Sequence, residues 1–262
     1  MTKQTPLDVV QYNKEAWNKE VEQGNTWTIP VDEETIEKAR QGDWDIVLTP
    51  TKAVPKEWFD GVKGKDILCM ASGGGQQGPL LAAAGGRVTV FDNSPAQLQR
   101  DRDASDAHGL DIVTVEGDMA NLSAFVDNAF DLIVHPVSNL FCSDIKPVWQ
   151  EAHRVLRPGG RMLSGFCNPL LYIFDAEKEE QQNILEVRHS IPYSDIGSIT
   201  EEERLRIYGG EAPLEFGHSL EDQIGGQCVA GFKIAGFYED TFGGEKLLDK
   251  YISVFMATLA VK

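Results

Sequence analysis

Between residues 66 and 166, the chain alternates short apolar runs with longer segments of mixed polarity. The runs are DILCMA, RVTVF, DIVTV, FDLIVH and RMLSGF, each bounded by turn-forming residues. Runs of this length and composition predict strands, and the segments between them predict helices. Repeated strand–helix units predict a parallel sheet with helices on both faces. The predicted fold class is therefore α/β, with a doubly wound, mostly parallel sheet.

Two of the predicted helices have recognisable ends. In NSPAQLQRDRDASDAHG, Ser94 is predicted to cap the helix, Pro95 to occupy its first turn, Gln97 to complete a capping box and Gly109 to end it. In DIKPVWQEAHRVLRPGG, the helix is predicted to stop at residues 158–160, Pro-Gly-Gly.

The segments that flank this core have a different character. Thr5 to Asp8 predict the start of an N-terminal helix, and Asp32 predicts the cap of a second. A Glu-rich stretch follows Phe166, and the C-terminus predicts a helix from Ser219 and then two antiparallel strands. The predicted units are a helical extension or lid (1–65), a cofactor-binding core (66–166), an inserted substrate cap (167–218) and a C-terminal helix with a strand pair (219–262).

The first predicted strand runs directly into a glycine cluster. Residues 73–78, GGGQQG, satisfy G-x-G-x-x-G between a strand and a helix, the context in which this pattern indicates nucleotide binding. A tight turn is the alternative interpretation. Asp92 favours a ligand, because it ends the next strand, 19 positions after Gly73, where a carboxylate accepts hydrogen bonds from ribose hydroxyls.

Composition limits the partners. The net charge of −17, without a basic cluster, predicts that the protein does not bind nucleic acid and favours small neutral or cationic molecules. The longest C-terminal apolar run has ten residues, too few for a membrane span, and the N-terminus lacks a signal-peptide core. We therefore expect a cytoplasmic protein without membrane association. Neither the four cysteines nor the five histidines show zinc-site spacing, so we expect no metal.

Five motifs in order resemble the class I S-adenosylmethionine-dependent methyltransferases: ILCMASGGGQ, VTVFDNSP, VEGDMANL, FDLIVH and LRPGGRML. The resemblance implies a Rossmann-like sheet of seven strands in the order 3-2-1-4-5-7-6, in which the seventh strand inserts antiparallel. It implies S-adenosylmethionine as cofactor and S-adenosylhomocysteine as its product. The glycine loop would approach the methionine part, Asp92 the ribose, and the Asp118-Met119 pair the adenine.

The resemblance and the residues beside the motifs give a predicted cofactor-binding set. It consists of Ala71, Ser72, Gly73, Gly75, Gln77, Asp92, Asn93, Asp118, Met119 and His135. The chain departs from the family at two positions, where Cys69 replaces a common acid and Ala71 a common glycine. These departures affect the usual contact with the ammonium group of the cofactor.

Fewer residues are candidates for catalysis and for substrate binding than for cofactor binding. His135 and His218 are the predicted general bases, if the acceptor must lose a proton, and a structural role is the alternative for each. Tyr12, Trp17 and Asn139 are the predicted substrate contacts. Trp27 is a further aromatic residue of the proposed lid.

The predicted function is methyl transfer from S-adenosylmethionine to a small-molecule acceptor. A NAD(P)-dependent oxidoreductase is the first alternative, although none of the six tyrosines has the lysine four positions later that a short-chain dehydrogenase requires. A non-catalytic S-adenosylmethionine-binding module is the second alternative.

Overall fold

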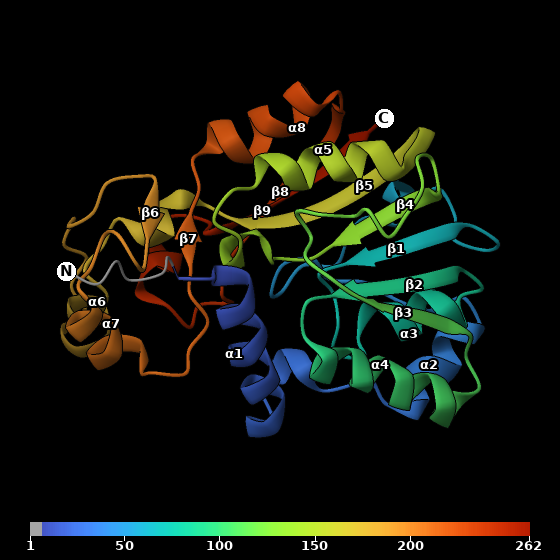
Figure 1. Cartoon of the computed structure of the whole chain (residues 1–262), viewed down its shortest axis with the longest axis horizontal. Coiled ribbons are helices and arrows are strands. Elements are labelled where there is room, and N and C mark those ends of the chain that lie inside the picture. The colour runs from blue at the N-terminus through green and yellow to red at the C-terminus, as the bar shows by residue number, and fades with distance from the viewer. Residues whose placement is uncertain (1–6) are drawn as a thin grey trace.

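A seven-stranded sheet forms the centre of the computed structural model, which describes residues 7–262 (Figure 1). Its order is β3-β2-β1-β4-β5-β9-β8. The strands are β1 (Asp66–Met70), β2 (Arg87–Asp92), β3 (Ile112–Glu116), β4 (Phe130–His135), β5 (Leu156–Cys167), β8 (Lys233–Asp240) and β9 (Phe255–Val261). The first five strands are parallel, and β9 lies antiparallel between β5 and β8. The predicted fold class and strand order are confirmed.

Helices cover both faces of the sheet, as the near-continuous apolar strands require. On one face lie α2 (Glu33–Arg40), α3 (Gln77–Ala83) and α4 (Pro95–His108), and on the other α5 (Lys146–Val155) and α8 (Gly226–Ala230) (Figure 1). The side chains of β1 alternate between two cores: Ile67 and Cys69 enter the first, and Leu68 and Met70 enter the second. All four are completely buried.

The helix ends agree with the predictions at some positions only. Ser94 Oγ accepts the N–H of Gln97 at 3.1 Å, and Gly109 ends α4 in the left-handed conformation. Gln97 does not complete a capping box, because the N–H of Ser94 donates to Asp92 Oδ1 instead. The stop predicted at 158–160 is also wrong, since α5 ends at Val155 and these residues lie within β5.

The N-terminal helix α1 (Val9–Gln23) begins after Asp8, whose carboxylate accepts the N–H of Gln11. The predicted start is therefore corrected to Asp8, while Thr5 and Pro6 lie outside the described residues. Asp32 caps α2 as predicted, by accepting the N–H of Thr35 at 2.8 Å. A short 3₁₀ turn, η1 (Thr26–Thr28), lies between α1 and α2, and a second, η2 (Lys56–Trp58), lies between α2 and β1.

The segment between β5 and α8 gathers beside α1, at one end of the sheet (Figure 1). It contains η4 (Pro169–Tyr172), α6 (Ala176–Gln182), α7 (Glu201–Tyr208) and the antiparallel pair β6 (Tyr193–Ser194) and β7 (Phe216–Gly217), and it leads into η5 (Glu221–Gly225). A third apolar cluster joins it to η3 (Asn139–Phe141), η6 (Leu247–Lys250) and the start of β9. Among residues 7–262, no helix combines the length and hydrophobicity needed to cross a membrane.

Candidate active site

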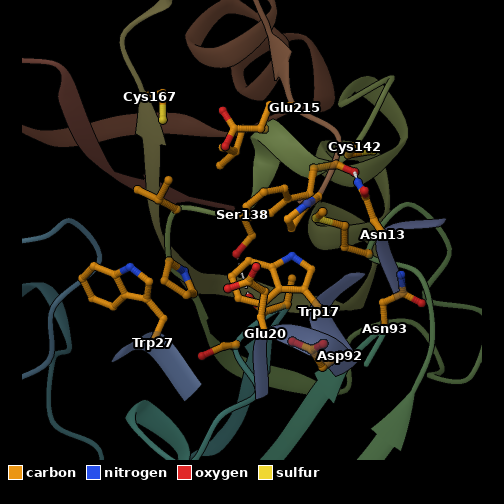
Figure 2. A pocket seen from close by; sticks show the side chains of 18 of the residues that line it. Asn13, Trp17, Glu20, Trp27, Asp92, Asn93, Ser138, Cys142, Cys167 and Glu215 are labelled. Atoms are coloured by element: carbon orange, nitrogen blue, oxygen red, sulfur yellow. Dashed lines mark hydrogen bonds between the residues drawn. The ribbon is translucent and has the colours of Figure 1, made fainter. Parts of the chain in front are cut away.

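A cavity of about 1010 Å³ opens beyond the carboxyl ends of the parallel strands. This is where open α/β sheets bind their ligands. Ala71 and Ser72 follow β1, Asp92 ends β2 and Pro136 follows β4, and all four line the cavity. Figure 2 shows Asp92 near one end of the residues drawn and Glu215 near the other, with α1 contributing Trp17 between them.

The glycine loop is constrained by the protein's own packing. Gly74 and Gly75 have φ angles of +117° and +78°. A Cβ on Gly74 would lie 2.6 Å from the carbonyl oxygen of Trp27, and one on Gly75 would lie 2.9 Å from a side-chain carbon of Pro30. Real Cβ atoms do not approach other atoms so closely, so the segment around η1 can pack on this loop only if the loop carries hydrogens there.

Asp92 connects the glycine loop to the helix that follows it. Its Oδ2 accepts the N–H of Gly73 at 2.8 Å, and its Oδ1 accepts the N–H of Ser94 at 2.8 Å. Burial raises the pKa of Asp92, while these donors and the N–H of Asn93 oppose the shift. A carboxylate oxygen can accept a second hydrogen bond, and Asp92 lines the cavity, so further donors can approach it there.

Asp101 is a second buried acid at the loop, and it was not among the residues that the sequence predicted. It lies on α4 with no exposed surface, and its Oδ2 accepts the N–H of Gly74 at 2.9 Å. Burial raises the pKa of Asp101 to about 8. The signal that could have found it is its spacing, because Leu98, Asp101 and Ser105 recur on one helix face that is otherwise buried.

The residues predicted near the adenine also line the cavity. Asp118 Oδ1 accepts the N–H of Ala120, and Met119 lies between them in the same turn. Asn93 Nδ2 donates to the carbonyl of Val10 at 2.9 Å, which attaches α1 to the turn after β2.

Eight of the ten predicted cofactor residues line the cavity: Ala71, Ser72, Gly73, Gln77, Asp92, Asn93, Asp118 and Met119. The amide of Gln77 is occupied by the protein, since its Nε2 donates to Val47 O and its Oε1 accepts from Ser72 Oγ. Gly75 and His135 do not contribute to the lining. Gly75 packs on Pro30 instead, and its carbonyl accepts the N–H of Val31.

His135 lies in the core rather than in the cavity. It is completely buried, with Nδ1 2.8 Å from the carbonyl oxygen of Met70 and Nε2 2.7 Å from Asn139 Oδ1. Asn139 is buried as well, and its Nδ2 donates to Gln223 Oε1. Burial lowers the pKa of His135. Both ring nitrogens face oxygen atoms of the protein rather than the cavity, and a neutral ring donates to one of the two, which favours the structural alternative. Asn139 is left without a surface for substrate.

His218 also faces away from the cavity. Its Nε2 lies 3.1 Å from the carbonyl oxygen of Asn139 and 2.8 Å from that of Cys142. Burial lowers the pKa of His218, so the neutral ring donates there and attaches the segment after β7 to η3. We therefore do not propose either histidine as a general base.

The aromatic residues of the N-terminal segment separate into two groups. Trp17 and Trp27 line the cavity, and Trp17 packs edge-on against Phe141 with ring centroids 5.1 Å apart (Figure 2). Tyr12 turns away from it. The hydroxyl of Tyr12 donates to Gly210 O and accepts from Arg204 Nη1, so Tyr12 joins α1 to α7.

The far end of the cavity contains residues that no sequence motif indicated. Glu215 and Cys167 line it together with Tyr172, whose hydroxyl donates to Glu215 Oε2 at 3.0 Å (Figure 2). These residues come from β5, η4 and the segment before β7, so only the folded chain brings them together.

Comparisons with known proteins agree with this geometry. A methyltransferase domain family model matches residues 68–164. The uncharacterized methyltransferase YbaJ of Bacillus subtilis is 52% identical over 254 residues, covering 97% of this chain and 98% of the relative. An S-adenosylmethionine-dependent methyltransferase from Mesorhizobium loti has a similar fold, with a TM-score of 0.60 at 17% identity, covering 80% of this chain and 94% of the other.

A second solved structure contains ligands. The 1,6-didemethyltoxoflavin-N1-methyltransferase of Burkholderia thailandensis, with bound 1,6-didemethyltoxoflavin and S-adenosylhomocysteine, gives a TM-score of 0.58 at 14% identity, covering 100% of this chain and 92% of the other. The near full-length match to the Bacillus protein adds to the ordered motifs and the strand order. Together they show that this chain belongs to the class I S-adenosylmethionine-dependent methyltransferases.

Proposed function

We propose that this protein transfers a methyl group from S-adenosylmethionine to a small-molecule acceptor. The observation that carries the proposal is the continuity of the cavity from Asp92 to Glu215. Its volume of about 1010 Å³ lies at the upper end of the roughly 300–1,000 Å³ that small-molecule sites occupy. This room beyond the cofactor residues favours an enzyme over a non-catalytic binding module.

The residues present fit the cofactor. In the proposal, Asp92 accepts the ribose hydroxyls, Asp118 accepts the adenine amine, and Met119 packs on the base. When bound, S-adenosylmethionine supplies a methyl group on a positively charged sulfur. The chain contributes orientation and the exclusion of water, for which Trp17 and Trp27 are placed.

A small acceptor agrees with the charge of the cavity wall. Acidic lining residues outnumber basic ones, and the chain has a net charge of −17, so a nucleic acid would be repelled. We propose in addition that α1 acts as a lid, because Val10, Asn13 and Trp17 lie on the cavity side of this helix.

Calorimetric titration with S-adenosylmethionine, S-adenosylhomocysteine and NAD tests the cofactor. We expect binding of the first two, with a higher melting temperature, and no binding of NAD. Incubation of candidate acceptors with methyl-labelled S-adenosylmethionine, followed by mass spectrometry, tests transfer. Selective stabilisation by NAD would refute the proposal, and binding without transfer to any small molecule would favour the non-catalytic alternative.

A further inference from the structure

A carboxylate without a cationic partner lies at the far end of the cavity. The hydroxyl of Tyr172 donates to Glu215 Oε2 at 3.0 Å. Within residues 7–262, no lysine or arginine forms an ion pair with Glu215. Glu215 is half-buried in the cavity wall, and a carboxylate that a ligand seals from water is costly unless a cation or several hydrogen-bond donors compensate it. The one phenolic donor leaves Glu215 short of such partners.

The position of Glu215 is fixed by the surrounding chain. Its backbone N–H donates to Asp195 Oδ2 at 2.8 Å. Tyr172, its side-chain partner, is buried and stacks on Tyr193 with ring centroids 5.3 Å apart. Glu215 is therefore held in place before any ligand arrives, which is a property of binding residues that work by pre-organisation.

The wall around Glu215 is largely apolar. Leu171, Phe242 and Phe255 line the cavity in the same cluster as Tyr172, and the Phe242 and Phe255 rings lie 4.7 Å apart. A ligand that fits this end has an apolar or aromatic body and one polar group directed at Glu215.

The charges along the cavity specify the sign of that polar group. The acidic lining residues are Glu20, Asp92, Asp118, Asp144, Glu179, Glu215 and Glu245. Among the described lining residues, Lys246 is the only lysine or arginine, and its side chain is exposed. A cavity lined mainly by acids raises the local concentration of cations and disfavours anions.

We infer that Glu215 binds the methyl acceptor, and that the acceptor is a small amine with an apolar body, whose protonated nitrogen Glu215 holds. This inference rests on the proposed function. An ammonium nitrogen has no free electron pair, so it must lose a proton before it can accept a methyl group. Glu215 takes that proton: the N–H bond breaks, the nitrogen keeps the electron pair, and the carboxylate becomes a carboxylic acid.

Glu215 is suited to both steps near neutral pH. Burial and the nearby charge of Asp195 raise the pKa of Glu215 to about 7. Three other titratable groups face it, namely Cys167, Tyr172 and Tyr208. Burial raises the pKa of each of these, so they stay protonated between pH 6 and 8, and Glu215 carries the change in charge.

The test uses three probes of matched shape: benzylamine, benzyl alcohol and benzoate. Each is titrated into the full chain saturated with S-adenosylhomocysteine, and binding is followed by calorimetry and by the melting temperature. We expect benzylamine to bind about tenfold or more tightly than benzyl alcohol, and benzoate not to bind. Its affinity should rise from pH 6 to pH 8, because Glu215 loses its own proton over that interval.

Variants identify the group responsible. Glu215→Gln keeps the shape and should abolish both the preference for benzylamine and its pH dependence, with S-adenosylhomocysteine affinity unchanged. Asp195→Asn should move the midpoint of the pH dependence downward, because it removes the neighbouring negative charge. Glu221→Gln, an exposed acid outside the cavity, is the matched control and should behave like the parent.

The outcomes separate the two proposals. If the parent protein does not bind S-adenosylhomocysteine, the proposed function fails. If it binds S-adenosylhomocysteine but shows no preference for benzylamine, or if Glu215→Gln keeps that preference, only the inference about Glu215 is overturned.

Discussion

The side-chain amide of Asn13 forms hydrogen bonds with both backbone groups of Leu214, 201 residues away. Asn13 Nδ2 donates to the carbonyl of Leu214 at 3.1 Å, and Asn13 Oδ1 accepts its N–H at 2.7 Å. Nδ2 also donates to the carbonyl of Phe141 at 2.9 Å. Helix α1 is thereby fixed to the residue that precedes Glu215.

Replacing Asn13 should loosen α1. Asn13→Ala removes the partner of the two buried backbone groups of Leu214 and of the half-buried carbonyl of Phe141, and each buried group left unpaired costs about 1–3 kcal/mol. We expect a lower melting temperature and faster hydrogen exchange of the α1 amides. Gln11→Ala is the control, since Gln11 is exposed and its side chain donates to Glu15 on the same helix. Unchanged exchange in Asn13→Ala would show that other contacts hold the helix.

A pair of glycine variants tests the packing of the glycine loop. Gly74 and Gly109 both have positive φ angles, but only a Cβ on Gly74 meets neighbouring atoms. Gly109→Ala should cost about 1–2 kcal/mol from backbone strain alone. Gly74→Ala adds a clash with Trp27 O worth about 1–3 kcal/mol. Denaturant unfolding measures the difference, and equal losses would contradict the packing account.

Asp92→Ala should weaken S-adenosylhomocysteine binding at least roughly tenfold, because hydrogen bonds to a charged group contribute about 1.5–3 kcal/mol each. It should also lower stability, since the N–H groups of Gly73 and Ser94 lose their acceptor. Asp92→Asn keeps one acceptor oxygen and should be intermediate in both. Calorimetric titration beside a thermal melt separates the two effects. A folded Asp92→Ala protein with parental affinity would exclude the ribose contact.

The buried Asp101 predicts part of the pH dependence of stability. Its pKa in the folded protein, about 8, lies above its ordinary value of 3.8. The folded state therefore holds more protons than the unfolded state between about pH 4 and 8, and the free energy of unfolding falls as pH rises. Asp101→Asn should flatten that fall. Exposed Asp106 on the same helix supplies the control Asp106→Asn, which should keep the parental slope.

The histidines predict a contrast between stability and turnover. His218→Gln should change turnover only a few-fold, because His218 bonds Asn139 O and Cys142 O rather than facing the cavity. His135→Ala should mainly lower the melting temperature. Steady-state rates and melts of both variants, measured with any acceptor found, check this. A hundredfold loss of turnover at unchanged stability would restore the general-base role.

Local sequence patterns predicted most of the elements of the fold. The apolar runs gave the strands of the core because burial on both faces demands continuous hydrophobicity, and Ser94 and Asp32 gave helix starts because capping is local. The order of the strands came with the family resemblance.

The site predictions that were wrong share one physical reason, which differs from the local patterns above. The sequence places His135 at a strand end, the correct edge of the sheet, but its two partners, Met70 and Asn139, are decided by tertiary packing. Glu215 has no motif around it and becomes notable only through Tyr172 and the cavity wall. Side-chain direction and long-range partners depend on contacts that no local spacing encodes.

The packing of the glycine loop also affects how its sequence would be conserved during evolution. Gly74 and Gly75 make room for Trp27 and Pro30 of the same chain, so selection for folding alone would preserve them. A descendant protein that had lost methyl transfer would still conserve these two glycines, because its fold would need them. Folding constrains Asp92 as well, because its carboxylate accepts two backbone hydrogen bonds. The side chain of Glu215 instead accepts the hydroxyl of Tyr172 and makes no contact of this kind with the glycine loop, so its replacement would leave that loop intact.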